Sequence, residues 1–309
     1  MNLEILQEVV KKNVGTKKLL FVTQFEELWF DALQSLMDLR KAGLNHVVFI
    51  HVVERSKVAM RRGKGYLKDE EVKLKEIANV RFIDWAESLF EQGMEVGAYI
   101  LVGELVPKVI AAAQEEDVDL IVTGYHKKGK IEELYAGSEI IEILRRTSKP
   151  VFVHKYMLPS GKVNDKPFEK PLLATDWSPA SERAVEILIN LKNAIKHIEV
   201  IHVASEKSFK GSSAMGVQKV RKETRQRLDE TCEIFHADGI DAEAHLYVGN
   251  IAEQINRAAY ERGASMIVAG TTGKGHWKER WLGSVPQELA EKSEFPTLLV
   301  PAEIKTTNS

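Results

Sequence analysis

The chain repeats itself, and the length of the repeat is the feature that most constrains its fold. Four landmarks occur twice with an offset of 146 residues. They are IVTG ending at Gly124 and IVAG ending at Gly270, Gly137-Ser138 and Gly283-Ser284, Val102-Gly103 and Val248-Gly249, and Pro150 and Pro296. Solenoid units are only about 20–50 residues long, so a repeat of this size is a whole domain. The sequence therefore predicts two tandem domains of one fold.

Short apolar runs alternate with longer amphipathic runs in each half. Most of the apolar runs lack polar alternation, which is typical of strands covered on both faces. They are residues 19–22, 47–53, 98–102, 120–122 and 151–153, and residues 172–174, 198–203, 243–248, 266–269 and 297–300. Amphipathic runs such as 105–116 and 251–262 predict helices between them; the second has Asn250 as its N-cap and Gly263 just past its end. Each half is therefore predicted to be a five-stranded parallel α/β domain.

Composition changes mark the domain boundaries. Both periodicities break over residues 156–169, where Pro, Gly, Ser, Asn and Lys predict a linker between domains 1–155 and 170–309. The apolar final strand of each domain invites edge-to-edge pairing, so we expect the two domains to pack through these strands as an internal pseudo-dimer. Residues 1–13 have no counterpart in the second repeat; we expect a helix docked on the sheet, with a membrane-surface anchor as the alternative.

Net charge and cysteine content indicate which kinds of partner and which cellular compartment suit the chain. The net charge is −2, which favours neither nucleic acid nor an anionic membrane. The basic stretches at residues 58–64 and 207–216 are interpreted as loops whose charge is solvated, with nucleic-acid contact as the alternative. The only cysteine, Cys232, excludes an intramolecular disulfide, and the chain has neither a signal-peptide pattern nor a run of about 18 apolar residues. We expect a soluble, cytoplasmic protein.

A glycine-rich loop follows the fourth predicted strand of the second half. It reads Gly270-Thr271-Thr272-Gly273, and nine residues later Gly283-Ser284 opens a helix. Such a loop lies at the carboxyl end of the sheet, where open α/β folds bind ligands. Glycines let a ligand approach the backbone, and the first amides of a helix face any anion above them. This pattern predicts a phosphate site, to which Lys274, His276, Lys278 and Arg280 add positive charge.

The same residues also have a purely structural interpretation, as a helix start and as turns. Ser284 and Gln287 have the spacing of a capping box, with Pro286 early in the first turn. Glycines are also common turn residues at strand ends. The spacing matches neither the Walker A motif nor the Rossmann dinucleotide fingerprint.

The loop and the opening of the second repeat, LLATDWSPAS at residues 172–181, together resemble the universal stress protein (UspA) superfamily. The resemblance covers residues 17–155 and 170–302 as two copies. It implies Rossmann-like, HUP-type domains with strand order 3-2-1-4-5, and pairing of the two copies within one chain. In ATP-binding members the nucleotide lies across the ends of strands 1 and 4, which implies ATP or AMP here, with or without Mg²⁺.

The resemblance implies a set of nucleotide-binding residues in the second repeat. They are Thr175, Asp176, Val203, Gly249, Gly270, Thr271, Gly273, Gly283, Ser284 and Val285. The first three would contact adenosine, and the residues of the glycine-rich loop would wrap ribose and phosphates. Two have equally simple structural roles: Asp176 complements the positive end of a helix, and Gly249 is a turn residue.

The first repeat departs from this pattern. Lys127 stands where the second repeat has Gly273, and Thr23 is taken as the counterpart of Asp176. Gly103, Gly124, Gly137 and Ser138 persist, which is sufficient for the turns and the helix start. We therefore expect the first site to be structurally intact but degenerate, and one nucleotide to bind per chain.

No residue pattern predicts catalysis or a metal site. His51 and His202 occupy equivalent strand positions, which indicates satisfied sheet histidines, and His126 and His276 lack a partner at ligand-like spacing. We expect at most slow ATP hydrolysis. The predicted function is a nucleotide-dependent sensor or regulator in the stress response, as a homodimer with unknown protein partners. The alternative is a stress scaffold or interaction protein that binds no nucleotide.

Overall fold

The computed structural model describes residues 15–23, 27–54, 67–124, 137–155, 158–205, 213–272 and 282–303. Ten strands form one continuous sheet in the order β3-β2-β1-β4-β5-β10-β9-β6-β7-β8. The strands are β1 (Lys18–Val22), β2 (His46–Glu54), β3 (Glu95–Gly103), β4 (Leu120–Gly124), β5 (Val151–His154), β6 (Pro171–Ala174), β7 (His197–Ala204), β8 (Asp241–Val248), β9 (Met266–Gly270) and β10 (Thr297–Val300). All ten predicted strands are present, and each half has the predicted order 3-2-1-4-5.

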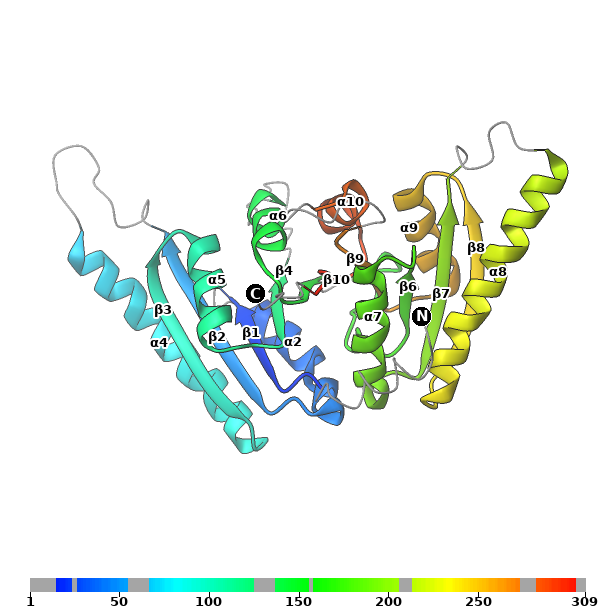
Figure 1. Cartoon of the computed structure of the whole chain (residues 1–309). Helices are drawn as coiled ribbons and strands as arrows, with labels where there is room; N and C mark the ends of the chain where they lie inside the picture. Colours follow the sequence, from blue (N-terminus) through cyan, green and yellow to red (C-terminus); the bar gives the residue numbers. More distant parts are fainter. Residues whose placement is uncertain are drawn as a thin grey trace, which may run out of the picture.

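The halves meet at the strands that the sequence singled out. β5 and β10 pair antiparallel, with Phe152 opposite Leu298, whereas the neighbours within each half pair in parallel. Arg183 reinforces this seam by donating to the carbonyl oxygens of Ser148 at 3.0 Å and Pro301 at 2.8 Å. This strand pairing confirms the predicted internal pseudo-dimer, and Figure 1 shows the two halves side by side.

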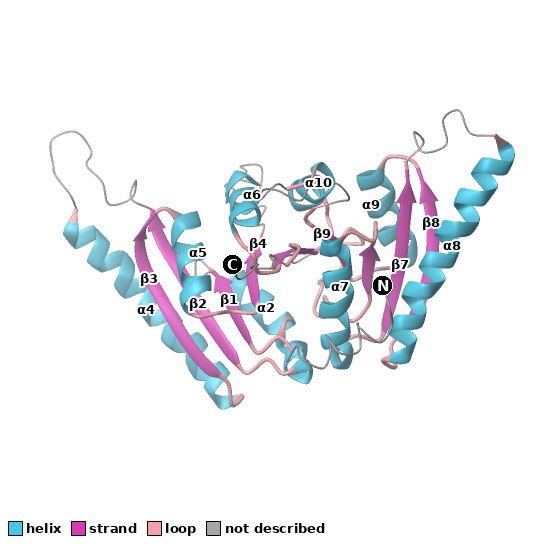
Figure 2. Ribbon diagram, in the orientation of Figure 1, coloured by secondary structure: helices cyan, strands magenta, loops and turns pink. Residues whose placement is uncertain are grey.

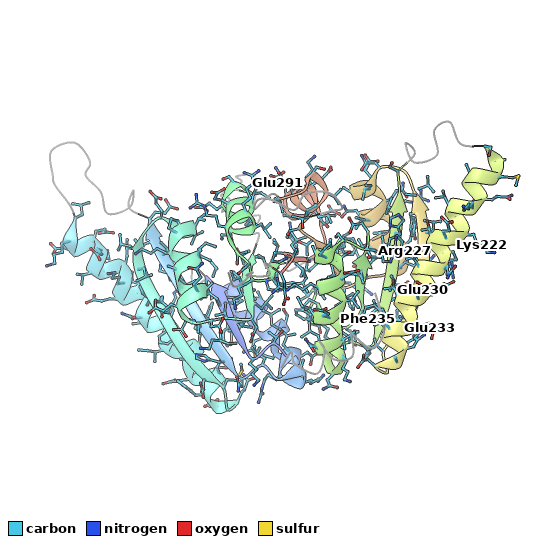
Figure 3. All side chains as sticks on the ribbon, in the orientation of Figure 1. Lys222, Arg227, Glu230, Glu233, Phe235 and Glu291 are labelled. Carbon is cyan, nitrogen blue, oxygen red and sulfur yellow. The ribbon has the colours of Figure 1, made fainter. Side chains whose placement is uncertain are left out.

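Helices cover both faces of the sheet (Figure 2). One face carries α2 (Glu27–Ser35), α4 (Lys68–Glu91), α7 (Pro179–Asn190) and α8 (Ala214–Ala237), with the short 3-10 helices η1 (Met37–Ala42) and η2 (Lys192–Ala194). The other face carries α5 (Leu105–Glu115), α6 (Gly137–Arg146), α9 (Ile251–Arg262) and α10 (Ser284–Lys292). Apolar side chains fill both interfaces; Phe235 of α8, labelled in Figure 3, is fully buried, while Glu230 and Glu233 of the same helix are exposed.

Helix ends both confirm and correct the sequence-based predictions. In α9 the Asn250 side chain accepts the Glu253 amide at 3.3 Å, and Gly263 ends the helix in a left-handed conformation, as predicted. The predicted capping box is wrong. Gly283 occupies the N-cap, Ser284 is already helical, and the Gln287 side chain donates to Glu291 at 3.1 Å instead of reaching back.

One predicted loop is in part helical, and one predicted helix lies outside the described residues. Residues 214–216, which we expected in a loop, begin α8 because the Ser213 hydroxyl caps it by accepting the Gly216 amide at 3.2 Å. The helix expected at residues 1–13 lies outside the described residues. Among the helices that the structure describes, none is long and apolar enough to cross a membrane.

Candidate functional site

The candidate site lies at the carboxyl end of β6, where the chain turns into α7. Thr175 follows β6 and stays in register, because its amide donates to the Ile201 carbonyl at 2.9 Å. One oxygen of Asp176, Oδ1, accepts the Ser178 amide at 3.0 Å and the Ser181 hydroxyl at 3.1 Å. Asp176 therefore performs the structural role considered for it, which is to hold the first turn of a helix.

A serine connects this turn to the glycine-rich loop. The Ser178 hydroxyl donates to the Thr272 carbonyl at 3.0 Å, and the Gly283 amide donates to the Thr271 carbonyl at 2.9 Å. These contacts join the turn after β6, the end of β9 and the start of α10 into one contiguous surface. Gly273, together with Lys274, His276, Lys278 and Arg280, lies outside the described residues.

The two motif glycines that the structure describes have different surroundings. A Cβ on Gly270 would lie 2.8 Å from the Ala180 Cβ and 2.9 Å from the Ser181 nitrogen, so α7 packs directly on this backbone. A Cβ on Gly283 would meet nothing closer than 3.4 Å, at Pro286. Helix packing therefore accounts for the glycine at 270 but not for the one at 283.

Two further predicted residues lie at the ends of the neighbouring strands. Val203 of β7 is 8 % exposed and packs into the core beneath α9. Gly249 follows β8 with a φ of +142°, a value that favours glycine, and its amide donates to the Ala204 carbonyl at 3.0 Å. Gly249 therefore acts as the turn residue considered in the sequence analysis. It lies at the edge of the sheet where proteins of this fold class bind ligands.

An aromatic stack beside the site escaped the sequence reasoning. Trp177 has a φ of +56°, which is unusual for a non-glycine residue, and its ring lies 4.6 Å from that of His202. The guanidinium of Arg227, labelled in Figure 3, lies 4.1 Å from the Trp177 ring centre. The only signal in the sequence was a tryptophan directly after Asp176.

Histidines on the second strand of each half are satisfied, as predicted. His202 Nδ1 lies 2.8 Å from the Thr175 carbonyl oxygen, and His51 Nδ1 lies 3.0 Å from the Thr23 carbonyl oxygen. These matching contacts show that Thr23 is the counterpart of Thr175. The predicted pairing of Thr23 with Asp176 is therefore wrong by one position, and Gln24 takes the place of the aspartate.

The first repeat has an acidic cavity at its own carboxyl end. This cavity has a volume of about 470 Å³ and lies between the ends of β2 and β3 and the helices α5 and α6. Its polar lining comprises Glu54, Glu104, Glu139, Glu142 and Arg146. Burial raises the pKa of Glu139, and the nearby Glu54 carboxylate raises it further.

The second repeat lacks most of these carboxylates. By position in the repeat, Ser205, Asn250 and Val285 replace Glu54, Glu104 and Glu139. Like charges repel, so carboxylates around a cavity oppose the entry of a polyphosphate. The first site therefore differs from the second in charge as well as at Lys127, which lies outside the described residues.

The fold and the site together define a tandem α/β protein with doubly wound halves. The universal stress protein family matches residues 15–155 and 167–301, and the chain belongs to this family. The Universal stress protein YxiE of Bacillus subtilis is 31% identical over 146 residues, which is 43% of this chain and 99% of that protein. A universal stress protein of Methanocaldococcus jannaschii is 25% identical over 157 residues, 46% of this chain and 97% of its own length.

A solved structure matches both halves together. The crystal structure of a universal stress protein from Archaeoglobus fulgidus superposes with a TM-score of 0.70 at 22% identity, covering 94% of this chain and 98% of that one. At this identity the match concerns the fold alone. It supports the arrangement of two such domains in one continuous chain.

Proposed function

We propose that this universal stress protein binds one ATP or AMP per chain, in the second repeat, and acts as a nucleotide-dependent sensor or regulator in the stress response. The observation that carries the proposal is the contiguous surface formed by the turn after β6, the end of β9 and the start of α10. It is held by the contacts of Ser178 with Thr272 and of Gly283 with Thr271. It lies at the carboxyl end of the sheet, where open α/β folds bind ligands.

The start of α10 supplies the phosphate-binding groups in this proposal. The first amides of a helix have no intrahelical acceptor, and the helix dipole favours an anion there. The Gly283 amide is already used by Thr271, so the phosphates are assigned to the amides of Ser284 and Val285. Gly283 contributes open space, Gly270 and Thr271 shape the strand end, and Gly273 completes the loop.

The other end of the nucleotide is assigned to the turn after β6. Adenosine would lie near Thr175, Asp176, Val203 and Gly249, and Mg²⁺ would arrive with a triphosphate. The acidic cavity of the first repeat supports one nucleotide per chain, because its carboxylates oppose phosphate. Binding rather than catalysis is proposed, with at most slow ATP hydrolysis.

Matched valine substitutions test this function. We expect isothermal titration calorimetry to find one ATP site per chain, and Gly283→Val to weaken binding at least tenfold because the side chain fills the phosphate approach. Gly137→Val, at the equivalent position of the first repeat, is the control and should leave binding unchanged. Two equivalent sites, or undiminished affinity in Gly283→Val, would contradict the proposal. Mass spectrometry of ligand released from the purified protein identifies the nucleotide.

The second candidate is a stress scaffold that binds no nucleotide. The use of Asp176 Oδ1 in the first turn of α7 favours it, because this contact explains the aspartate without a ligand. Absence of ATP and AMP binding at millimolar concentration, with normal folding, would make the scaffold the better account.

The proposal also includes two domains, 1–155 and 170–309, joined by a linker. It places the protein in the cytoplasm, as a homodimer. The outer face of α4 supports self-association, because Val80 and Phe90 are 61% and 57% exposed there. Their counterparts on α8, Gln226 and His236, are polar, so the fold itself does not require an apolar face. Sedimentation equilibrium should give a dimer that Val80→Glu dissociates; a monomeric native chain would contradict it.

A further inference from the structure

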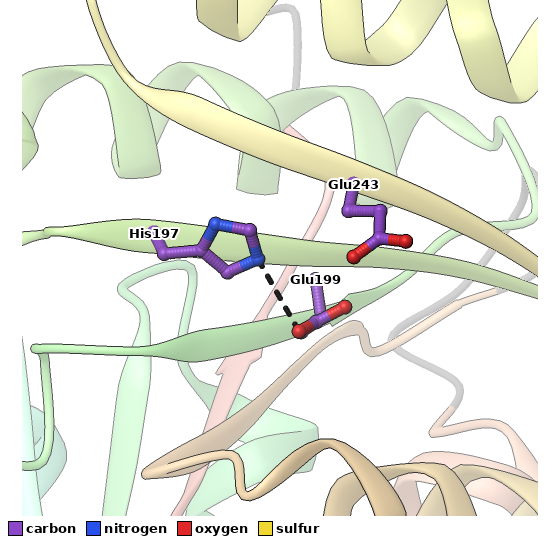
Figure 4. A group of neighbouring side chains, drawn as sticks. All are labelled: His197, Glu199 and Glu243. Carbon is purple, nitrogen blue, oxygen red and sulfur yellow. Dashed lines mark ion pairs between the residues drawn. The ribbon is translucent and has the colours of Figure 1, made fainter.

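A cluster of histidine and carboxylate side chains lies at the amino-terminal end of β7 and β8, away from the proposed nucleotide site. His197 and Glu199 lie two residues apart on β7 and so share a face. Asp241 and Glu243 lie directly beside them on β8. Figure 4 shows His197, Glu199 and Glu243 converging, and one ligand atom of each lies within 4.8 Å of the others.

Both ring nitrogens of His197 face carboxylates. Nδ1 lies 2.7 Å from Asp241 Oδ2, and Nε2 lies 3.2 Å from Glu199 Oε1. A neutral imidazole has only one N–H, so one nitrogen would direct its lone pair at a carboxylate oxygen. A metal ion bound at Nε2 would satisfy both ring nitrogens, because Nδ1 would keep its N–H towards Asp241.

We propose that this cluster binds a divalent metal ion of the zinc type, through His197 Nε2 and the carboxylates of Glu199 and Glu243. Zinc binds imidazole nitrogen and carboxylate oxygen at about 2.0–2.2 Å, which puts neighbouring ligand atoms of a tetrahedron roughly 3.3 Å apart. The separation of 3.2 Å between His197 Nε2 and Glu199 Oε1 agrees with this spacing. The imidazole favours zinc over Mg²⁺ or Ca²⁺, which prefer oxygen.

Neighbouring groups fit the roles of a second coordination shell. A metal-bound histidine usually donates its other N–H to a carboxylate, and Asp241 accepts from Nδ1 of His197 in this way. His245 Nε2 lies 3.0 Å from the second oxygen of Glu199 and orients that carboxylate. Three protein ligands leave a fourth position for water.

A lysine competes with the metal for Glu199. Lys170 Nζ lies 2.9 Å from Glu199 Oε1 and also donates to the Arg262 carbonyl at 2.6 Å. The Arg262 carbonyl would keep the Lys170 ammonium hydrogen-bonded if a metal ion took the Glu199 oxygen. The positive charge of Lys170 weakens metal binding, so we expect micromolar affinity rather than the much tighter binding of a closed structural zinc site.

The first repeat provides an internal control. It keeps the outer pair, since His46 Nδ1 lies 3.5 Å from Glu95, the counterpart of Asp241. Val48 and Gly97 replace Glu199 and Glu243, so both carboxylate ligands are missing. The ligand set is therefore specific to the second repeat and is not a requirement of the fold.

Zinc titration of the full chain tests the site. After treatment with EDTA and dialysis, calorimetry with ZnCl₂ at pH 7 should show one micromolar site. His197→Gln and Glu243→Gln, which change partly or fully exposed side chains, should each weaken zinc binding at least tenfold. His46→Gln in the first repeat should bind zinc as the native chain does. Circular dichroism melting verifies that each variant folds.

Two results would overturn the proposal. One is the absence of zinc binding by the native chain at 100 μM, which would leave the cluster as a network of ion pairs around Glu199 and Lys170. The other is zinc binding by folded His197→Gln and Glu243→Gln variants at native affinity. The proposal does not depend on nucleotide binding, because the cluster lies at the opposite end of the strands.

Discussion

Replacing Gly270 with alanine should destabilise the protein even without any ligand. The added Cβ would lie 2.8 Å from the Ala180 Cβ and 2.9 Å from the Ser181 nitrogen, and the latter atom belongs to the helix backbone. Overpacking of this kind costs about 1–3 kcal/mol of unfolding free energy. At about 2–4 °C per kcal/mol, we expect the melting temperature to fall by about 2–12 °C.

Gly283→Ala is the matched control for this experiment. Its Cβ would meet only ordinary contacts from 3.4 Å, and its φ of −63° suits alanine. The substitution should change stability by less than about 1 kcal/mol, because the less flexible unfolded chain favours alanine whereas the N-cap position favours glycine. Calorimetric melting of nucleotide-free protein measures both variants. An unchanged melting temperature for Gly270→Ala, or an equal loss for Gly283→Ala, would refute the assignment of Gly270 to helix packing.

Two further predictions concern the first repeat. Burial lowers the pKa of His154 to about 4, whereas the pKa in an unfolded chain is about 6.5. The unfolded chain therefore takes up a proton first as the pH falls. The contribution of the neutral ring to the free energy of unfolding is complete above pH 6.5 and is lost as the pH falls towards 4. Urea denaturation should show a loss of about 2 kcal/mol at pH 5 that His154→Gln removes; an unchanged pH profile in that variant would contradict it. Converting Glu54, Glu104 and Glu139 to Ser, Asn and Val should add a second ATP site in calorimetry. A folded variant with no second site would show that these carboxylates alone do not exclude nucleotide.

The strands were predictable because their burial on both faces leaves an uninterrupted apolar run. The limits of α9 were predictable from single residues as well. The Asn250 side chain caps the start of the helix, and Gly263 adopts the left-handed conformation that ends it. The role of Gly270 was not predictable, because a glycine at a strand end looks the same whether a ligand or a helix approaches it. The misplacement of Thr23 has another cause: the offset of 146 residues does not extend to the first strands, and only hydrogen-bond partners reveal the true counterpart.

The two repeats place one functionally equivalent carboxylate at different positions of the same fold. Each half has a partly exposed lysine at the start of its first strand, and each supplies a carboxylate for it. Lys18 contacts Glu116 at the end of α5 at 3.1 Å, whereas Lys170 contacts Glu199 within β7 at 2.9 Å. Because the lysine is neutralised in both cases, moving the carboxylate onto the strand leaves the fold unchanged and places it beside His197. The chemistry of each half can therefore change while the sheet, which depends on apolar burial, remains the same.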